Sequence, residues 1–311
     1  MGRNKTNEIW AIAGGKGGTG KTFVISQIAS YLASINKKVI LIDTDFGGAN
    51  LHSFFGIENR KKTIKDFYKN DVPLESLIVK TKINNLEVIP GDINSTIFDV
   101  IKYNKKIKLF SHIKKLDADY ILLDLGGGFN KNIIDFFLLA DKMIVATVPE
   151  ITAIENLFQF IKSTFFRKLN FLLGIYGLKN FAKDAWEQRA DKNIVTILDL
   201  IDYVKEESGD IGEIAIKELQ NFRINIILNK VRDSSEIKEG FSLKSICIKL
   251  IGINALYSGY IEYDNHFWRN LSLTQLSNEI NISLKTKKDI KRIVTNIINE
   301  KQIAIEISKN E

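Results

Sequence analysis

A glycine-rich loop near the start of the chain constrains the fold more than any other feature. Residues 15–22 read GKGGTGKT and match the pattern G-x-x-x-x-G-K-S/T in full. They follow an apolar run at 9–13 and precede residues 23–35, whose apolar positions have helical spacing. Small residues let successive backbone N–H groups curl around phosphate oxygens, and the start of the helix adds its dipole. The loop therefore predicts a phosphate-binding site between a strand and a helix.

Each residue type in this loop has a chemical role at a nucleotide. Lys21 is expected to reach the β- and γ-phosphates, and the Thr22 hydroxyl is expected to bind Mg²⁺. The other residues expected to bind the nucleotide are Gly15, Lys16, Gly17, Gly18, Thr19 and Gly20. The alternative, a glycine-rich turn with an incidental lysine, does not explain a full match in a strand–loop–helix context.

Short apolar runs alternate with longer amphipathic segments along the chain. The predicted strands lie at 9–13, 39–43, 86–90, 120–124, 143–148, 224–229 and 257–261. Runs without polar alternation are typical of parallel strands that are buried on both faces. With helical crossovers, they predict a doubly wound α/β fold with a mainly parallel sheet flanked by helices. We expect a single domain over residues 1–311, with a helical insertion at about 170–220, where 195–206 has the clearest helical spacing.

Three aspartates stand at or just beyond the ends of predicted strands. Asp43 ends the strand at 39–43, Asp45 follows two positions later, and Asp124 ends the strand at 120–124. An open α/β sheet places its ligand site at such strand ends. Beside a phosphate loop, the first two are well placed to hold Mg²⁺-bound water and orient an attacking water, and Asp124 to associate with Mg²⁺. An aspartate-rich turn with a helix cap explains one of the first two carboxylates but not both.

A second loop lysine, Lys16, follows Gly15 directly. With this lysine, the segment 43–51 and the strand-end Asp124, the chain resembles the deviant Walker A ATPases of the MinD/ParA family, in the SIMIBI class of P-loop NTPases. The resemblance implies a homodimer that forms with ATP, in which Lys16 reaches the nucleotide of the partner. The alternative is an exposed loop lysine that contacts only the nucleotide of its own chain.

The resemblance also implies roles for residues outside the loop. Asp45 would polarise the attacking water, Asp43 would support the metal shell, and Asn50 would position the switch segment. Asn229 would contact the adenine ring, and the alternative is a structural asparagine at a strand end. A GTP-binding N-K-x-D pattern would need an aspartate at position 232, where Arg232 stands. We therefore expect ATP and Mg²⁺ as the cofactors.

The leading hypothesis is a slow ATPase switch that a regulatory protein stimulates. It would dimerise with ATP and regulate the position or number of a cellular structure, namely a flagellum, a division site or a DNA locus. The segments at 136–139, 148–150 and 154–156 resemble the flagellar regulators (FlhG-like) within the MinD/ParA-like ATPases. The usual G-x-I-P-x-D motif reads GYIEYD at 259–264, with Glu262 in place of the proline. The residues expected to carry hydrolysis are Lys16, Lys21, Asp45 and Asn50.

Two other functions on the same fold remain open. A metallocluster carrier would need a C-x-x-C pair, and the chain has only Cys247. An ATP-dependent metabolic synthetase would use the insertion as a lid over its substrate, but it would leave Lys16 without a role.

The charge of the chain bears on its partners and location. A net charge of +7 can attract nonspecific DNA or an anionic membrane surface, and the alternative is a lysine-rich solvated surface. The apolar spacing at 287–298 is more typical of a helix packed on the sheet than of a membrane-binding helix. The single cysteine and the lack of a signal peptide pattern predict a cytoplasmic protein, with peripheral attachment to the inner membrane as the alternative.

Overall fold

Eight strands form one sheet in the computed structural model, which describes residues 7–45, 51–57, 62–91, 103–265 and 282–303. The strands are β1 Glu8–Ala13, β2 Val39–Asp43, β3 Val79–Lys80, β4 Leu86–Ile89, β5 Tyr120–Asp124, β6 Lys142–Thr147, β7 Arg223–Val231 and β8 Asn254–Glu262. Their order is β3-β4-β2-β5-β1-β6-β7-β8, and all neighbours are parallel except β3 and β4. The predicted doubly wound, mainly parallel sheet is therefore confirmed.

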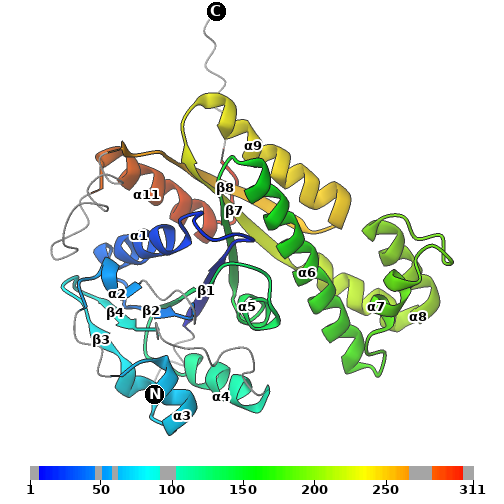
Figure 1. The fold of residues 1–311 in the computed structure, drawn as a ribbon, viewed down its shortest axis with the longest axis horizontal. Helices are drawn as coiled ribbons and strands as arrows, with labels where there is room; N and C mark the ends of the chain where they lie inside the picture. Colours follow the sequence, from blue (N-terminus) through cyan, green and yellow to red (C-terminus); the bar gives the residue numbers. More distant parts are fainter. Residues whose placement is uncertain (1–6, 46–50, 58–61, 92–102, 266–281, 304–311) are drawn as a thin grey trace, which may run out of the picture.

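Helices cover both faces of the sheet, because side chains alternate between two buried cores along each strand. In β1, Ile9 and Ala11 belong to one core, and Trp10 and Ile12 belong to the other. The helices on the second core are α1 Lys21–Ser34, α2 Leu51–Phe54 and α11 Leu284–Ile298. The helices on the first core are α3 Ile64–Asn70, α4 Tyr103–Ile113, α5 Lys131–Phe137, α6 Ile151–Ile175 and α9 Ser234–Ile246, with short turns at Leu74–Leu77 and Cys247–Ile251 (Figure 1).

Helix α11 packs on the sheet, as its apolar spacing predicts. Ile290, Ile293, Val294 and Ile297 are all buried against β8 and α1. Ser283 caps the start of the helix, where its hydroxyl accepts a hydrogen bond from the Thr286 backbone N–H at 3.1 Å. In the part of the chain that the structure describes, no helix is long and apolar enough to span a bilayer.

The helical region at 170–220 begins inside a longer helix. Helix α6 passes position 170 without a break, and α7 Phe181–Glu187 and α8 Ile197–Gln220 follow it. A capping box between Thr196 and Asp199 starts α8, and Gly209 bends it with a φ of 51° and a ψ of −134°. Ile197 and Leu200 of α8 belong to the same buried core as one face of the sheet. The single-domain organisation of 1–311 stays a prediction.

One nearly buried carboxylate joins three of these helices. Asp135 of α5 contacts Lys106 of α4 at 2.6 Å and Arg167 of α6 at 2.8 Å. The side chains of Lys106 and Asp135 are only 7% and 12% exposed. Burial alone would raise the pKa of Asp135, but Arg167 and Lys106 hold it below its ordinary value. The cluster fixes α6, which also contacts the phosphate loop described below.

Removing this carboxylate should destabilise the fold. Asp135→Asn keeps the shape of the side chain but leaves the nearly buried Lys106 and the partly exposed Arg167 without this carboxylate, so we expect a loss of about 3 kcal/mol in the free energy of unfolding. Urea denaturation would measure it. Asp71→Asn is the matched control, because the Lys108–Asp71 pair is exposed and its loss should be within experimental error. Equal losses in the two variants would contradict a stabilising role for the cluster.

Candidate functional site

The phosphate loop connects β1 to α1 at the centre of the sheet. Gly18 and Gly20 have φ angles of 80° and 85°, which a residue with a Cβ rarely adopts. Lys21 is buried, and its Nζ donates a hydrogen bond to the Lys16 backbone carbonyl at 3.2 Å. Burial lowers the pKa of Lys21, while the nearby Asp124 and Asp45 carboxylates raise it. The loop thus carries a desolvated cation at the start of a helix, as a phosphate site requires.

The loop lies directly against the first turns of α6. A Cβ on Gly15 would overlap the backbone carbonyl of Asn156, and a Cβ on Gly14 would lie 2.5 Å from the carbonyl of Ala146. Only glycine permits this approach of two backbones. A movement of the loop therefore displaces α6, and a movement of α6 displaces the loop.

Lys16 also contacts α6 in this structure. Its Nζ donates a hydrogen bond to the Thr152 hydroxyl at 3.0 Å and lies 3.7 Å from Oε2 of Glu150. The Lys16 side chain is 42% exposed, so its amine remains open to solvent. Its expected reach to the nucleotide of a partner stays a prediction.

Two of the predicted metal-site carboxylates lie side by side. Asp43 and Asp124 are register partners at the ends of β2 and β5, and both are buried. Asp43 accepts hydrogen bonds from the backbone N–H groups of Asp45 at 3.0 Å and Leu51 at 3.2 Å. Burial raises the pKa of both carboxyls, the charge of Asp124 raises the pKa of Asp43 further, and the charge of Asp45 raises the pKa of both. For Asp124 the pKa rises to about 7, although Thr22 and Lys21 lower it.

The donors at this point fit Mg²⁺. The Thr22 hydroxyl hydrogen-bonds to Asp124, whose buried Oδ1 has no hydrogen-bond partner among the described residues. An unpaired buried carboxylate oxygen is costly unless a cation or water reaches it. Hydroxyl and carboxylate oxygens are the ligands that Mg²⁺ prefers, together with water and phosphate. Within the described ranges there is no cluster of three His, Cys, Asp or Glu residues that could hold a metal.

Of the two residues predicted for the switch segment, Asp45 and Asn50, the structure describes Asp45. Asp45 lies over Gly126, where its Oδ1 is 2.8 Å from the position a Cβ would take. This places its carboxylate close to Lys21 and Asp124. Asn50 lies outside the residues that the structure describes. The structure therefore brings Asp45 into the site and leaves the role of Asn50 a prediction.

Asn229 holds the phosphate loop from the β7 side. Its buried Nδ2 donates a hydrogen bond to the Thr19 carbonyl at 2.9 Å and packs against Gly20. This contact is structural, and the adenine contact stays a prediction. Lys230, which the sequence analysis did not single out, donates to the Gly18 carbonyl at 3.1 Å. Its place directly after Asn229 is the one sequence signal that could have indicated it.

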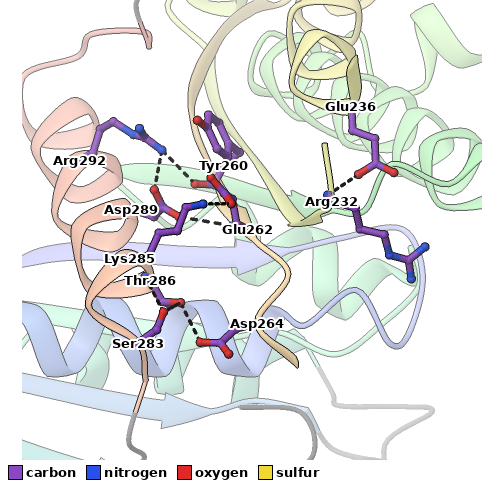
Figure 2. A network of polar contacts seen from close by, with 10 residues as sticks. All are labelled: Arg232, Glu236, Tyr260, Glu262, Asp264, Ser283, Lys285, Thr286, Asp289 and Arg292. Atoms are coloured by element: carbon purple, nitrogen blue, oxygen red, sulfur yellow. Dashed lines mark hydrogen bonds and ion pairs between the residues drawn. The ribbon is translucent and has the colours of Figure 1, made fainter. Parts of the chain in front are cut away.

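The replacement of proline by Glu262 has a visible consequence at the end of β8. Unlike proline, Glu262 has a backbone N–H, which donates to Oδ2 of Asp289 at 3.3 Å. Lys285 forms an ion pair with the Glu262 carboxylate, and Arg292 contacts Oδ1 of Asp289 at 2.8 Å (Figure 2). Thr286 contacts Asp264 at 3.5 Å in the same network. These contacts connect the end of β8 to the first turns of α11.

The fold and this loop define the class of protein, a P-loop NTPase. The loop joins the first strand to a helix, and carboxylates end the two strands that pair beside it. A family model described as an AAA domain matches residues 7–171, and the chain belongs to this family as a P-loop ATPase of the MinD/ParA type.

Curated relatives of the chain include septum site-determining proteins. MinD of Synechocystis sp. is 32% identical over 152 residues, which make up 48% of this chain and 56% of that protein. MinD of Buchnera aphidicola is 31% identical over 193 residues, or 61% of this chain and 63% of that protein. The chain thus matches little more than half the length of these relatives.

Solved structures share the fold over nearly the whole chain. MinD of Pyrococcus horikoshii, complexed with Mg-ADP, has a TM-score of 0.60 at 19% identity and covers 94% of this chain and 96% of its own. A plasmid partition protein of Borrelia burgdorferi, bound to AMPPNP, has a TM-score of 0.62 at 20% identity and covers 94% and 99%. At these identities the likeness shows the fold.

The contact between the loop and α6 predicts a difference between two loop glycines. Gly15→Ala should lower the melting temperature of the nucleotide-free protein by several degrees, because its Cβ would displace the Asn156 backbone. Gly17→Ala is the matched control, since a Cβ at Gly17 meets no atom within 4 Å. Thermal unfolding followed by circular dichroism would measure both. A Gly15→Ala protein as stable as Gly17→Ala would contradict the close packing.

The raised pKa of Asp124 predicts how stability depends on pH. Folded and without nucleotide, Asp124 keeps its proton up to about pH 7, whereas an unfolded aspartate releases it near pH 4. The free energy of unfolding should therefore fall as pH rises from about 4 to about 7, with up to about 4 kcal/mol from this group. Above that range this loss is complete.

Two variants separate this carboxyl from the rest of the chain. Asp124→Asn should show a smaller fall with pH and should be more stable than the wild type above pH 7, without nucleotide. Asp191→Asn, at an exposed aspartate outside the site, should follow the wild type. Urea unfolding at a series of pH values measures each variant. Parallel profiles for Asp124→Asn and the wild type would show that Asp124 is ionised in the folded protein.

Proposed function

We propose that this chain is a slow, ATP-hydrolysing switch that dimerises with ATP and helps to position a cellular structure. The observation that carries the proposal is Lys16, a second lysine in a complete phosphate loop. Its side chain is partly exposed, and its amine contacts Thr152 and Glu150 at the start of α6, so it can exchange this contact for a phosphate.

The residues around the loop support ATP binding and hydrolysis. Lys21 would neutralise the β- and γ-phosphates, and Thr22 and Asp124 would hold Mg²⁺, with Asp43 supporting its shell. When bound, Mg²⁺ supplies positive charge against the phosphate oxygens. Asp45 would orient the attacking water, because its carboxylate lies against Gly126 and close enough to Lys21 to raise the pKa of that lysine.

In the proposed dimer, Lys16 leaves Thr152 and Glu150 and binds the nucleotide of the partner chain. The contact it gives up is small, because it consists of one hydrogen bond and a 3.7 Å ion pair to an exposed carboxylate. A triphosphate offers more negative charge at a less hydrated site, so exchange is favourable with ATP and weaker with ADP. ATP hydrolysis would then return Lys16 to α6 and open the dimer.

The relatives of the chain support a role in positioning. They include septum site-determining proteins and a plasmid partition protein, so a division site or a DNA locus is the better-supported target. The flagellar role stays a prediction from the sequence. A MinC:MinD cell division complex from Aquifex aeolicus supports the proposal of a regulatory partner protein. We place the switch in the cytoplasm, where a membrane surface or nonspecific DNA would recruit it.

The two alternative functions are less well supported. Cys247 is buried, and burial raises the pKa of its thiol to about 12, so it is poorly suited to carry a metal cluster. A synthetase would need the 170–220 helices to cover the nucleotide, but α6 carries them away from the loop (Figure 1). The switch therefore accounts for more of the site.

The proposal predicts that ATP changes the oligomeric state. In multi-angle light scattering with Mg²⁺, replacing ADP by ATP should raise the mean mass of the wild-type particle at least twofold. Lys16→Ala should lose this rise while still binding nucleotide, and Lys37→Ala, at an exposed lysine outside the site, should keep it. No change of mass in the wild type would overturn the dimer, and a full response from Lys16→Ala would overturn the role of Lys16.

A further inference from the structure

An apolar face of α6 continues beyond the part of the helix that the protein covers. Leu157, Phe160 and Thr164 recur at steps of three and four residues and are buried. Phe171 and Ile175 continue the same spacing, seven and eleven residues after Thr164, but they are 60% and 62% exposed. Two large apolar side chains on one helix face are thus mostly exposed at the end of α6.

This exposed end is distant from the phosphate loop. Helix α6 has 25 residues and therefore a length of ~37 Å. Its first turn contacts Lys16, and its last turns lie with α7 and α8 in a helical module that stands apart from the sheet (Figure 1). A surface on this module is separate from an interface built around Lys16.

Basic side chains lie around the exposed pair, of which Arg167 pairs with Asp135 and Lys183 with Glu187. Residues 156–183 contain no aspartate or glutamate and five lysines or arginines. Lys168 is three residues before Phe171, and Lys179 lies beside the last turn of α6, with its Cβ 4.0 Å from the position of a Cβ on Gly174. Neither lysine forms an ion pair within the part of the chain that the structure describes. The pair Phe171 and Ile175 is therefore an apolar patch with a basic border.

Helix α8 carries the opposite combination. Seven of its 24 residues are acidic and two are basic. Ile214 is 45% exposed, and Asp210 and Glu218 lie four residues before and after it on the same face. These two acids form no ion pair among the described residues either. This is an apolar patch with an acidic border.

We propose that the helical module binds the module of a second copy of this chain, with α6 of each copy against α8 of the other. Each patch offers the apolar contact and the charge that the other lacks, so the surface is complementary to itself. A twofold arrangement makes both contacts twice, which doubles the apolar area buried. This interface does not need nucleotide.

The consequence for the proposed switch is a chain with two separate interfaces. This step rests on the proposed function, because it uses the ATP-dependent contact through Lys16. The module would join copies without nucleotide, and ATP would join the resulting dimers through the other end of α6. Alternating interfaces that do not close into a ring produce an open assembly, so ATP would lengthen it and hydrolysis would shorten it.

Charge reversal tests the module interface in the full chain. Variant A carries Lys168→Glu and Lys179→Glu, and variant B carries Asp210→Lys and Glu218→Lys. In sedimentation velocity with ADP, the wild type should be a dimer. Each variant alone should have a dimer dissociation constant at least about tenfold higher than that of the wild type. An equimolar mixture of A and B should form a mixed dimer, because each altered patch then meets its complement. Lys37→Glu with Lys69→Glu, at exposed lysines elsewhere, should leave the wild-type dimer intact.

The outcomes separate this interface from the ATP switch. A wild type that is monomeric with ADP, variants that remain dimers, or a mixture that stays monomeric would each overturn the module interface. A wild-type mass that rises with ATP from a monomer would support the switch and reject this interface. A dimer with ADP that A and B disrupt, but that ATP leaves unchanged, would support this interface and reject the switch. Unchanged melting curves for A and B exclude unfolding as the cause.

Discussion

The contact between the phosphate loop and α6 is the constraint on which the rest of the site depends. Gly15 lies against the Asn156 backbone, so the loop has little freedom on that side. On the opposite side, the Asn229 amide binds the Thr19 carbonyl, and β7 thereby holds the loop as well. The backbone N–H groups of the loop are thus oriented before a phosphate arrives, which lowers the entropy cost of binding. The same contact gives α6 a direct connection to whatever the loop binds.

The charges of the nucleotide-free site are poorly satisfied, and this favours a ligand. Burial lowers the pKa of Lys21 and raises the pKa of Asp43 and Asp124, so three ionisable groups are held in conditions that oppose their charges. A nucleotide with Mg²⁺ supplies both charges that these groups need: phosphate oxygens for Lys21 and a cation for the two carboxylates. Binding then stabilises the folded protein as well as the complex. A site of this kind responds strongly to which nucleotide is present.

The sequence predicts the parallel strands closely because they are apolar runs buried on both faces, and it misses only β3, a two-residue strand that is not buried, among the strands of the described residues. The predictions at 39–43 and 120–124 coincide with β2 and β5. The loop and its carboxylates follow from local patterns as well. Contacts between distant segments do not, because composition shows a residue's chemistry but not its partner. Lys16 with Thr152, and Lys230 with Gly18, are 136 and 212 residues apart and appear only in the fold. Helix α6 runs through position 170 without a break, a continuity that the sequence pattern does not indicate.

The most direct test of the switch is an experimental structure with Mg²⁺ and a non-hydrolysable ATP analogue. The account predicts two copies facing each other across their phosphate loops, with Nζ of Lys16 released from Thr152 and in contact with a phosphate of the partner's nucleotide. Asp124 and Thr22 should lie next to the Mg²⁺ ion. A single copy with nucleotide bound and Lys16 still on Thr152 would contradict the account.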